Sequence, residues 1–240
     1  MAMIKLTGIN KIYRTNEIET LALENVNLDV IKGEFVSIMG PSGCGKSTLL
    51  NIMGLLDAPS SGKIEINGTS VESMKDKELS AFRNKTLGFV FQSFNLINYK
   101  NAVENVALPL SFRGVPRGRR REMAEKYLKM VGLEKVGDHM PNQMSGGQQQ
   151  RVGIARALVV HPEIIFADEP TGNLDSHTTM DVLKLMQRIV REQNQTLVMV
   201  THDNHLAAYA DRIFHIIDGK IVKIEENRQM GKEDGKIEEI

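Results

Sequence analysis

Residues 40–47 have the sequence Gly40-Pro41-Ser42-Gly43-Cys44-Gly45-Lys46-Ser47. This octapeptide matches the pattern G-x-x-x-x-G-K-[ST], in which glycines let several backbone N–H groups converge on phosphate oxygens. A short apolar run at 34–39 precedes it and is typical of a buried strand in a parallel sheet. Apolar residues at helical spacing follow it from Lys46 onward. A strand, a glycine-rich loop and a helix in this order predict a phosphate-binding loop in an α/β fold.

Each part of the loop has a chemical task. The start of the following helix brings a partial positive charge to the phosphates. Lys46 is expected to contact the β- and γ-phosphates, and the Ser47 hydroxyl to bind Mg²⁺. Cys44 is either a redox thiol or a small residue accepted in a tight loop; we favour the second because thiol reactivity needs a particular environment. The predicted nucleotide contacts from this region are Gly40, Pro41, Ser42, Gly43, Cys44, Gly45, Lys46, Ser47 and Thr48.

Strand and helix signals alternate on both sides of the loop. A helix that places Val182 and Met186 on one apolar face is expected between two of the strands. Alternation and short apolar runs predict strands at 4–6, 26–30, 63–67, 87–91, 163–167, 196–201, 214–217 and 221–224, the last two completing the core. This order of elements favours an α/β fold with a mostly parallel sheet.

The middle of the chain differs, because helical spacing replaces strand signals from about 93 to 160. A charged helix is expected at 119–131, and another begins at Ser145, where Gln148 three residues on completes a capping-box pattern. We predict a P-loop NTPase core with a mostly parallel sheet, an antiparallel β portion and a helical subdomain inserted at about 93–160. Residues 1–225 are expected to form a single domain, and 226–240 a charged tail.

Composition excludes several classes of protein. Thirty Lys and Arg balance 30 Asp and Glu among 240 residues, which argues against a dedicated nucleic-acid binder. One cysteine excludes an intramolecular disulfide and multi-cysteine zinc sites. No apolar run approaches the roughly 20 residues of a membrane span, and Lys5 interrupts the N-terminal apolar stretch, so neither span nor signal peptide is predicted. We expect a soluble, cytoplasmic chain that can dock on a membrane protein.

A second motif ends the strand expected at 163–167. The run Ile164-Ile165-Phe166-Ala167 leads into Asp168 and Glu169. Ligands of open α/β sheets collect at the carboxyl ends of the strands, so Asp168 is expected to join the magnesium shell. Glu169 is placed to orient or deprotonate the attacking water. Taken alone, the pair is as often a solvated strand end, but the phosphate loop upstream favours the functional interpretation.

A third motif resembles a family signature. Met144-Ser145-Gly146-Gly147-Gln148 is similar to LSGGQ, the signature of ATP-binding cassette (ABC) ATPases, and Ser145 lies 23 residues before Asp168, as in that family. The resemblance covers residues 3 to about 225. Further family marks follow in order, namely Tyr13 for adenine stacking, Gln92 of the Q-loop, Asn173-Leu174-Asp175 of the D-loop and the switch histidine His202.

The resemblance implies a role for each mark. Ser145, Gly146, Gly147 and Gln148 would bind the γ-phosphate of ATP held by a second subunit. Gln92 would reach the magnesium beside Ser47 and Asp168, and catalysis would use Glu169, His202, Lys46 and Gln92. Plainer interpretations remain for four of these positions: a capped helix start at Ser145, a surface amide at Gln92, a structural histidine at His202 and a core aromatic at Tyr13.

Finer features resemble one branch of the family. Residues 92–97, 104–110 and 170–175 are similar to the ATPases of lipoprotein-release, macrolide-export and antimicrobial-peptide transporters and of a cell-division relative. Two departures, Met144 for the usual Leu and Phe166 for an aliphatic residue, touch no polar catalytic group. Residues 97–100 lie where such proteins meet their membrane partner.

The resemblance implies an ATPase subunit of an ABC transporter, with ATP and Mg²⁺ as cofactors. Two copies would enclose two Mg–ATP, a separate membrane permease would be the partner, and the subunit would sit at the inner face of the cell membrane. A soluble ABC ATPase acting on ribosomes or DNA is disfavoured by the single cassette, the zero net charge and the lack of a long coiled-coil insertion. A module using ATP only as a switch is disfavoured by Glu169 and His202. Cargo, transport direction and permease are not indicated.

Overall fold

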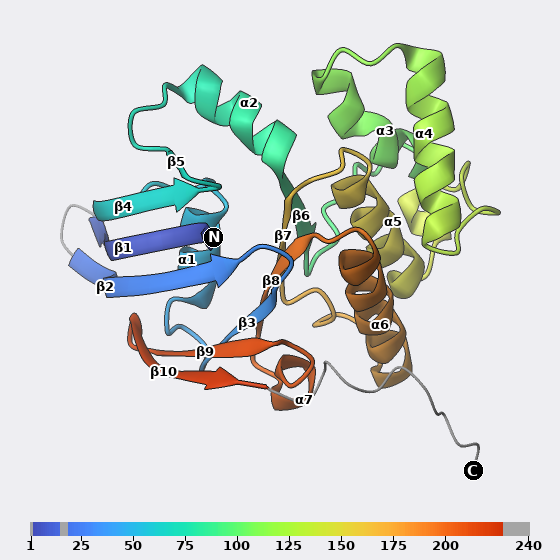
Figure 1. Ribbon diagram of the computed structural model, residues 1–240. Helices are drawn as coiled ribbons and strands as arrows, with labels where there is room; N and C mark the ends of the chain where they lie inside the picture. The colour runs from blue at the N-terminus through green and yellow to red at the C-terminus, as the bar shows by residue number, and fades with distance from the viewer. Residues whose placement is uncertain (1, 15–18, 228–240) are drawn as a thin grey trace.

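Two sheets form the β structure of the chain (Figure 1). The computed structural model describes residues 2–14 and 19–227. The smaller sheet is antiparallel, with strand order β2-β1-β4-β5. Its strands are β1 (Ala2–Arg14), β2 (Glu19–Ile31), β4 (Ser61–Ile66) and β5 (Thr69–Ser70). This sheet is the antiparallel portion predicted from the sequence.

The larger sheet has strand order β10-β9-β3-β8-β7-β6, and all neighbours except β10 and β9 are parallel. Its strands are β3 (Phe35–Met39), β6 (Leu87–Phe91), β7 (Ile164–Asp168), β8 (Thr196–Thr201), β9 (Arg212–Ile217) and β10 (Lys220–Glu226). Parallel strands end at one edge, so Met39 lies beside Thr201, and Phe91 beside Asp168. The motifs that follow these strands therefore meet at one edge of the sheet.

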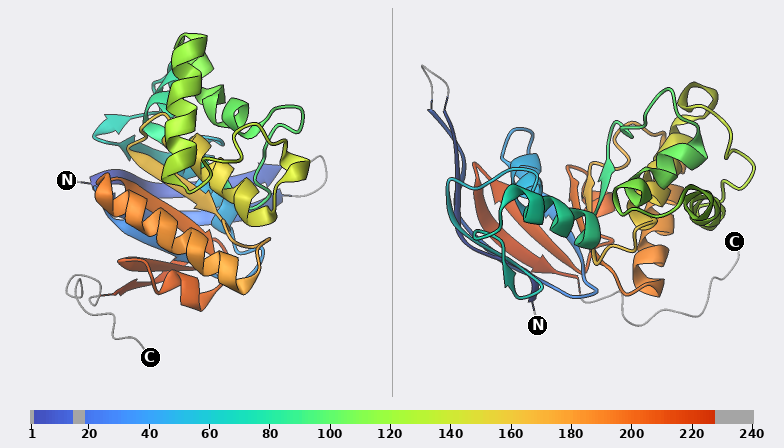
Figure 2. Two further views of the ribbon diagram at one scale, coloured as in Figure 1. Left: turned by 90° about the vertical axis from the view of Figure 1, so that its right-hand side faces the viewer. Right: turned by 90° about the horizontal axis from the view of Figure 1, so that it is seen from above.

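Alternate residues of the parallel strands pack on opposite sides of this sheet. Val36 and Phe166 belong to a core shared with the antiparallel sheet and helix α1 (Lys46–Met53). Phe35 and Ile165 belong to a second core, shared with helices α5 (Gly146–Leu158) and α6 (Ser176–Glu192). The phosphate-loop helix and the helix that follows the signature thus cover opposite faces of one sheet, as Figures 1 and 2 show.

The helical block lies between β6 and β7 in the chain and, in space, to one side of the sheets (Figure 2). It contains α3 (Ala102–Phe112), α4 (Arg117–Met130), the 3₁₀ turn η1 (Pro141–Gln143) and α5. The predicted capping box is present, because the Ser145 side chain accepts a hydrogen bond from the Gln148 N–H and the Gln148 side chain accepts one from the Ser145 N–H. The α/β fold with inserted helices is confirmed.

Two helices were not predicted, α2 (Asp76–Thr86) and the short α7 (Asn204–Ala207). Of the residues of α2, Thr86 alone is fully buried, and Leu79 and Phe82 pack partly buried against the core. This apolar face is too short to stand out in the sequence pattern. The boundaries of α2 are instead set by charge: Asp76 and Glu78 lie in the first turn, Arg83 and Lys85 in the last, and each pair complements the helix dipole.

The prediction that residues 221–224 complete the core is wrong for half of the run. β10 is an edge strand, and Val222 and Ile224 are 55% and 51% exposed, although Ile221 packs against the core. The ladder with β9 is irregular between Ile221 and Lys223, which interrupts the in-and-out alternation. Of the predicted tail at 226–240, Glu226 is the last residue of β10, and residues 228–240 lie outside the described part. None of the helices in the described part is long and apolar enough to cross a membrane.

Candidate nucleotide-binding and catalytic site

The phosphate loop connects β3 to α1 and folds around its lysine. Lys46 is 6% exposed, and its Nζ donates to the carbonyl oxygens of Gly40 at 2.9 Å and Pro41 at 2.7 Å. The ammonium group is therefore held inside the turn by the backbone. A point charge fixed there, at the start of a helix, favours an anion with several oxygens, such as a polyphosphate.

Glycine at position 45 is needed for two reasons. Its φ of 103° lies in the left-handed region, and a Cβ there would come within 2.6 Å of the Ala22 carbonyl oxygen. Cys44 beside it is 4% exposed, and its carbonyl accepts a hydrogen bond from the Gly219 N–H at 3.0 Å. The loop is thus packed against β2 and the β9–β10 turn, and the burial of Cys44 agrees with the small-residue interpretation.

The end of β7 brings a carboxylate to the loop. The Ser47 hydroxyl donates to Oδ1 of Asp168 at 3.2 Å. Burial raises the pKa of Asp168; the charge of Glu169 raises it too, while the Ser47 hydrogen bond and the charge of Lys46 lower it. A hydroxyl paired with one carboxylate suits Mg²⁺, which keeps several waters and takes other oxygens from substrate phosphates. In the described part, no three His, Cys, Asp or Glu side chains are arranged so that they could hold a metal ion, so the donor set is not an all-protein cage.

Glu169 and His202 form the second pair at this edge. His202 Nδ1 lies 3.0 Å from Glu169 Oε1, and the histidine side chain is 65% exposed while the glutamate is 23% exposed. Glu169 has a φ of 43°, a backbone conformation that costs a non-glycine residue of order 1–3 kcal/mol. Its N–H donates to the Val200 carbonyl at 3.0 Å, which ties the strained residue to β8. A cavity of about 310 Å³ lies beside the pair, between Leu174 and Met180.

Gln92 follows β6 and lies against the turn after β7. A Cβ added to Gly172 would come within 2.6 Å of Gln92 Nε2, so the amide occupies the space that a side chain would need. The Asn173 side chain donates to the Gln92 carbonyl at 3.0 Å. The predicted Q-loop at Gln92 and the predicted D-loop at 173–175 are therefore in direct contact. The D-loop follows the Asp168–Glu169 pair closely in the chain.

Tyr13 is 42% exposed, which excludes the core interpretation of this aromatic residue. Its hydroxyl donates to Asp57 Oδ2 at 2.9 Å, and Lys11 Nζ lies 4.8 Å from the ring centroid. Burial acts to raise the pKa of Asp57, but hydrogen bonds from Lys11, Tyr13 and the Ala58 N–H outweigh it and hold that pKa below its usual value. Lys11 and Asp57 thus orient the ring. Neither was singled out from the sequence, because their partners lie more than 40 residues away.

The signature residues are not part of this cluster. Gly147 packs on the start of α6 so closely that a Cβ would overlap the Thr178 side chain. Within the described ranges, no hydrogen bond or ion pair joins residues 145–148 to residues 40–47. The structure therefore brings together Lys46, Ser47, Asp168, Glu169 and His202, whereas the capped start of α5 lies against Leu174 of the predicted D-loop and against Thr178.

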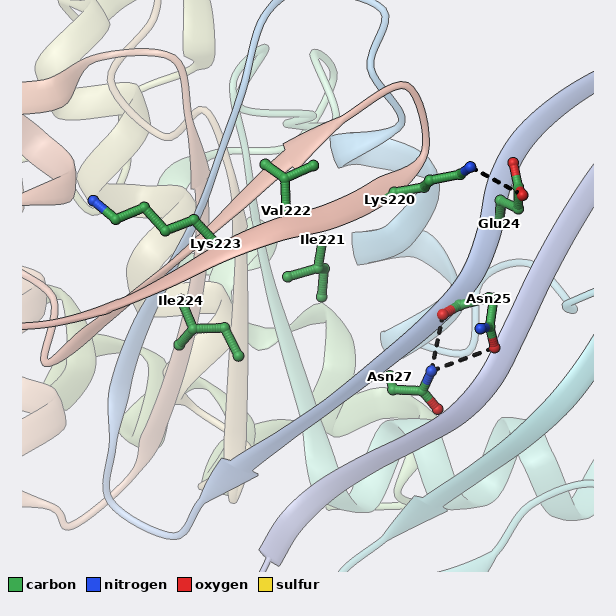
Figure 3. Close-up of a pocket in the computed structure, with 8 residues that line it drawn as sticks. All are labelled: Glu24, Asn25, Asn27, Lys220, Ile221, Val222, Lys223 and Ile224. Atoms are coloured by element: carbon green, nitrogen blue, oxygen red, sulfur yellow. Dashed lines mark hydrogen bonds and ion pairs between the residues drawn. The ribbon is translucent and has the colours of Figure 1, made fainter.

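A hollow of about 500 Å³ lies away from these motifs, where the edge strands β2 and β10 face each other (Figure 3). It is lined by Asn25, Asn27, Val222 and Ile224 among others, and Lys220 pairs with Glu24 at 3.0 Å across its end. None of the predicted site residues lines it, and its polar groups pair with near neighbours.

The family follows from the sequence match. The ABC transporter family model matches residues 23–172, which include the phosphate loop, the signature and the Asp168–Glu169 pair. The chain belongs to the ABC transporter family. An uncharacterized ABC transporter ATP-binding protein of Methanocaldococcus jannaschii, MJ1508, is 50% identical over 92% of this chain and 99% of its own length. ABC-family membership accounts for the order of the motifs along the chain.

Two further relatives carry the names of the predicted branch. The lipoprotein-releasing system ATP-binding protein LolD of Bacteroides thetaiotaomicron is 48% identical over 92% of this chain and 100% of its own length. The macrolide export ATP-binding/permease protein MacB of Chlorobaculum tepidum is 48% identical over 92% of this chain, which spans 34% of that longer protein. The predicted resemblance to this branch is confirmed.

A solved structure supports the fold and the activity class. The dimeric, post-hydrolysis structure of the ATP-binding cassette MJ0796 bound to ADP and Pi superposes with a TM-score of 0.88 at 47% identity, covering 94% of this chain and 99% of that one. The α/β ABC ATPase fold is therefore shown for this chain, together with its place among nucleotide-binding ATPases.

Proposed function

We propose that this chain is the ATP-hydrolysing subunit of an ABC transporter, and that two copies close on two Mg–ATP to drive a separate membrane permease. The observation that supports it most directly is the convergence of two pairs at one sheet edge, Ser47 with Asp168 and Glu169 with His202. The Ser47–Asp168 pair suits the binding of a magnesium ion beside the phosphates. The Glu169–His202 pair suits a water molecule aligned to attack the phosphate.

The roles divide by geometry. Lys46 binds the β- and γ-phosphate oxygens from within its loop. Ser47, Asp168 and Gln92 would hold Mg²⁺. When bound, Mg²⁺ would neutralise the charge that develops on the phosphates. Glu169 accepts a proton from the attacking water, and His202 keeps the carboxylate oriented. Tyr13 stacks on the adenine with the ring face that Lys11 leaves free.

The dimer follows from the placement of two helices. α1 and α5 cover opposite faces of the parallel sheet, so a chain's own signature is not positioned at its own phosphate loop. A second copy facing the first can bring its Ser145 and Gly147 N–H groups to the γ-phosphate. The similar cassette MJ0796 was solved as a dimer.

A groove of about 680 Å³ supports the permease part of the proposal. Phe89 and Phe91 from β6 and Leu108 and Phe112 from α3 line it, and Phe112 is 76% exposed. These walls fit an apolar helix of a permease, and the related MacB joins an ATP-binding part and a permease in one protein. The subunit would then lie at the inner face of the membrane.

The neighbouring segment 97–100 is fixed in the same region. Asn105 is fully buried and accepts from the Ile97 N–H at 2.8 Å while donating to the Lys100 carbonyl at 2.9 Å. Tyr99 between them is 78% exposed. The segment predicted to lie at the membrane partner, residues 97–100, therefore presents Tyr99 to solvent on a turn that Asn105 holds in place.

The test combines hydrolysis with localisation. The purified chain should hydrolyse ATP only with Mg²⁺, at a rate that ribosomes or DNA do not change. It should sediment with membranes only when a permease encoded beside it is coexpressed. Stimulation by ribosomes or DNA without membrane recruitment would favour the soluble ABC ATPase instead. We also propose that residues 1–225 act as one domain, so a chain ending at Asn227 should retain hydrolysis.

A further inference from the structure

Helix α5 is bonded to the catalytic edge by two side chains that have no assigned role. Both reach backbone carbonyls of other segments. Gln150 contacts the turn after Glu169, and Arg156 contacts the loop after Gln92. The helix therefore touches both of the segments that hold the groups acting on water and metal.

Gln150 is fully buried, and its Nε2 donates to the Pro170 carbonyl. Pro170 directly follows Glu169, whose left-handed backbone needs support from outside. The Oε1 of Gln150 has no hydrogen-bond partner within the described ranges, so the bond from Nε2 is the one that satisfies this buried amide there. The bond fixes the carbonyl one residue beyond the proposed base.

Arg156 lies in the last turn of α5 and donates to the carbonyl oxygens of Asn95 at 2.6 Å and Phe94 at 2.8 Å. Phe94 and Asn95 are consecutive non-glycine residues with φ of 61° and 49°, an arrangement that persists only when neighbours impose it. Burial lowers the pKa of Arg156, and among the described residues no carboxylate pairs with it. The Arg156 guanidinium therefore holds the backbone of the loop after Gln92 in this conformation.

We infer that Gln150 and Arg156 are positioning residues for hydrolysis: Gln150 acts through Glu169, and Arg156 acts through Gln92. This inference rests on the proposed function, because it assigns no new reaction. Arg156 and Asn95 also line the apolar groove proposed for the permease. A permease helix in that groove would therefore touch the two residues that form this hydrogen bond. Loss of either bond should slow hydrolysis without weakening ATP binding, since neither side chain contacts the phosphate loop.

The experiment uses the purified full chain. Gln150→Leu and Arg156→Met remove the hydrogen bonds to the backbone carbonyls while keeping side chains of similar size. Each should lower kcat by about tenfold or more, because small misplacements of catalytic groups have large effects. The KM for ATP should change less than about twofold. Gln187→Leu and Arg121→Met are matched controls: Gln187 donates to the Tyr209 carbonyl, and Arg121 is an exposed partner of Glu125. Both controls should keep the wild-type kcat.

Double-mutant cycles separate positioning from general stability. In a Glu169→Gln background, Gln150→Leu should cause no further loss in single-turnover hydrolysis of labelled ATP, whereas Arg156→Met should still slow it. In a Gln92→Ala background the pattern should reverse. Additive losses in both backgrounds, or equal losses of kcat and ATP affinity, would overturn the inference.

If Arg156→Met does not fold, Arg156→Lys replaces it. A smaller loss of kcat with the same result in the double-mutant cycle supports the role, and a wild-type kcat overturns it. A wild-type chain that binds ATP without hydrolysing it contradicts the proposed function instead.

Discussion

The catalytic edge and the β2–β10 hollow differ in how their polar groups are held. The hollow is the larger, at about 500 Å³ against about 310 Å³ beside Glu169 and His202. Its polar side chains bond within one strand or to a neighbouring strand, as in the Asn27–Asn25, Asn27–Gly8 and Lys220–Glu24 contacts. At the catalytic edge, groups from β3, β6, β7 and β8 converge. Convergence of separate elements, rather than the size of a cavity, marks the functional region.

The largest expected effect concerns Lys46. Lys46→Ala removes the cation fixed within the phosphate loop, so ATP hydrolysis should fall to background and ATP binding should weaken. A phosphate-release assay and calorimetric titration measure the two effects. Lys220→Ala in the hollow is the matched control and should leave both unchanged. Wild-type turnover in Lys46→Ala would place the catalytic region elsewhere.

The second prediction concerns Glu169. Glu169→Gln keeps the shape and a hydrogen bond to His202 but removes the base, so hydrolysis should fall by roughly 10²–10⁴-fold. ATP should then persist and hold two copies together, because it binds across the closed pair. Size-exclusion chromatography with light scattering should show an ATP-dependent dimer. Adding Ser145→Arg should return the protein to monomers; an ATP-bound Glu169→Gln protein that stays monomeric would contradict the shared site.

The third prediction concerns Tyr13. Tyr13→Ala should weaken the binding of ATP and of GTP by similar factors, because stacking on a base contributes roughly 1–3 kcal/mol whatever the base. Tyr13→Phe loses the bond to Asp57 but keeps the ring, so most of the affinity should remain. Calorimetry with both nucleotides measures this, and a loss restricted to ATP would indicate contacts to the adenine edge instead.

The smallest effect is expected in the hollow. Val222→Ser replaces a half-exposed residue on an edge strand, so the free energy of unfolding should change by at most about 0.5 kcal/mol and hydrolysis should not change. Urea unfolding and the phosphate-release assay measure both. A clear loss of hydrolysis would mean that this region contributes to function and would remove the contrast drawn above.

The sequence was informative where local chemistry sets the structure. The glycine pattern at 40–47 and the Ser145–Gln148 capping box predicted a loop and a helix start at the positions where they lie. Pairings over long distances were not predicted: Asp57 with Tyr13, Gln150 with Pro170, and Arg156 with Phe94 depend on the assembled fold. Gln150 and Arg156 bond to backbone carbonyls, and such contacts leave no periodic pattern in the sequence, so neither residue could be singled out from it.

The placement of α1 and α5 on opposite faces of one sheet has a genetic consequence. In the proposed dimer, each composite site would take its phosphate loop from one chain and its signature from the other. A chain with Lys46→Ala and a chain with Ser145→Arg should therefore each be inactive when paired with a copy of itself. When the two meet, both defects fall in the same composite site, and the opposite site is built entirely from intact residues. Two null alleles of this gene should therefore complement each other, and coexpression of the two mutant chains should restore hydrolysis that neither shows alone.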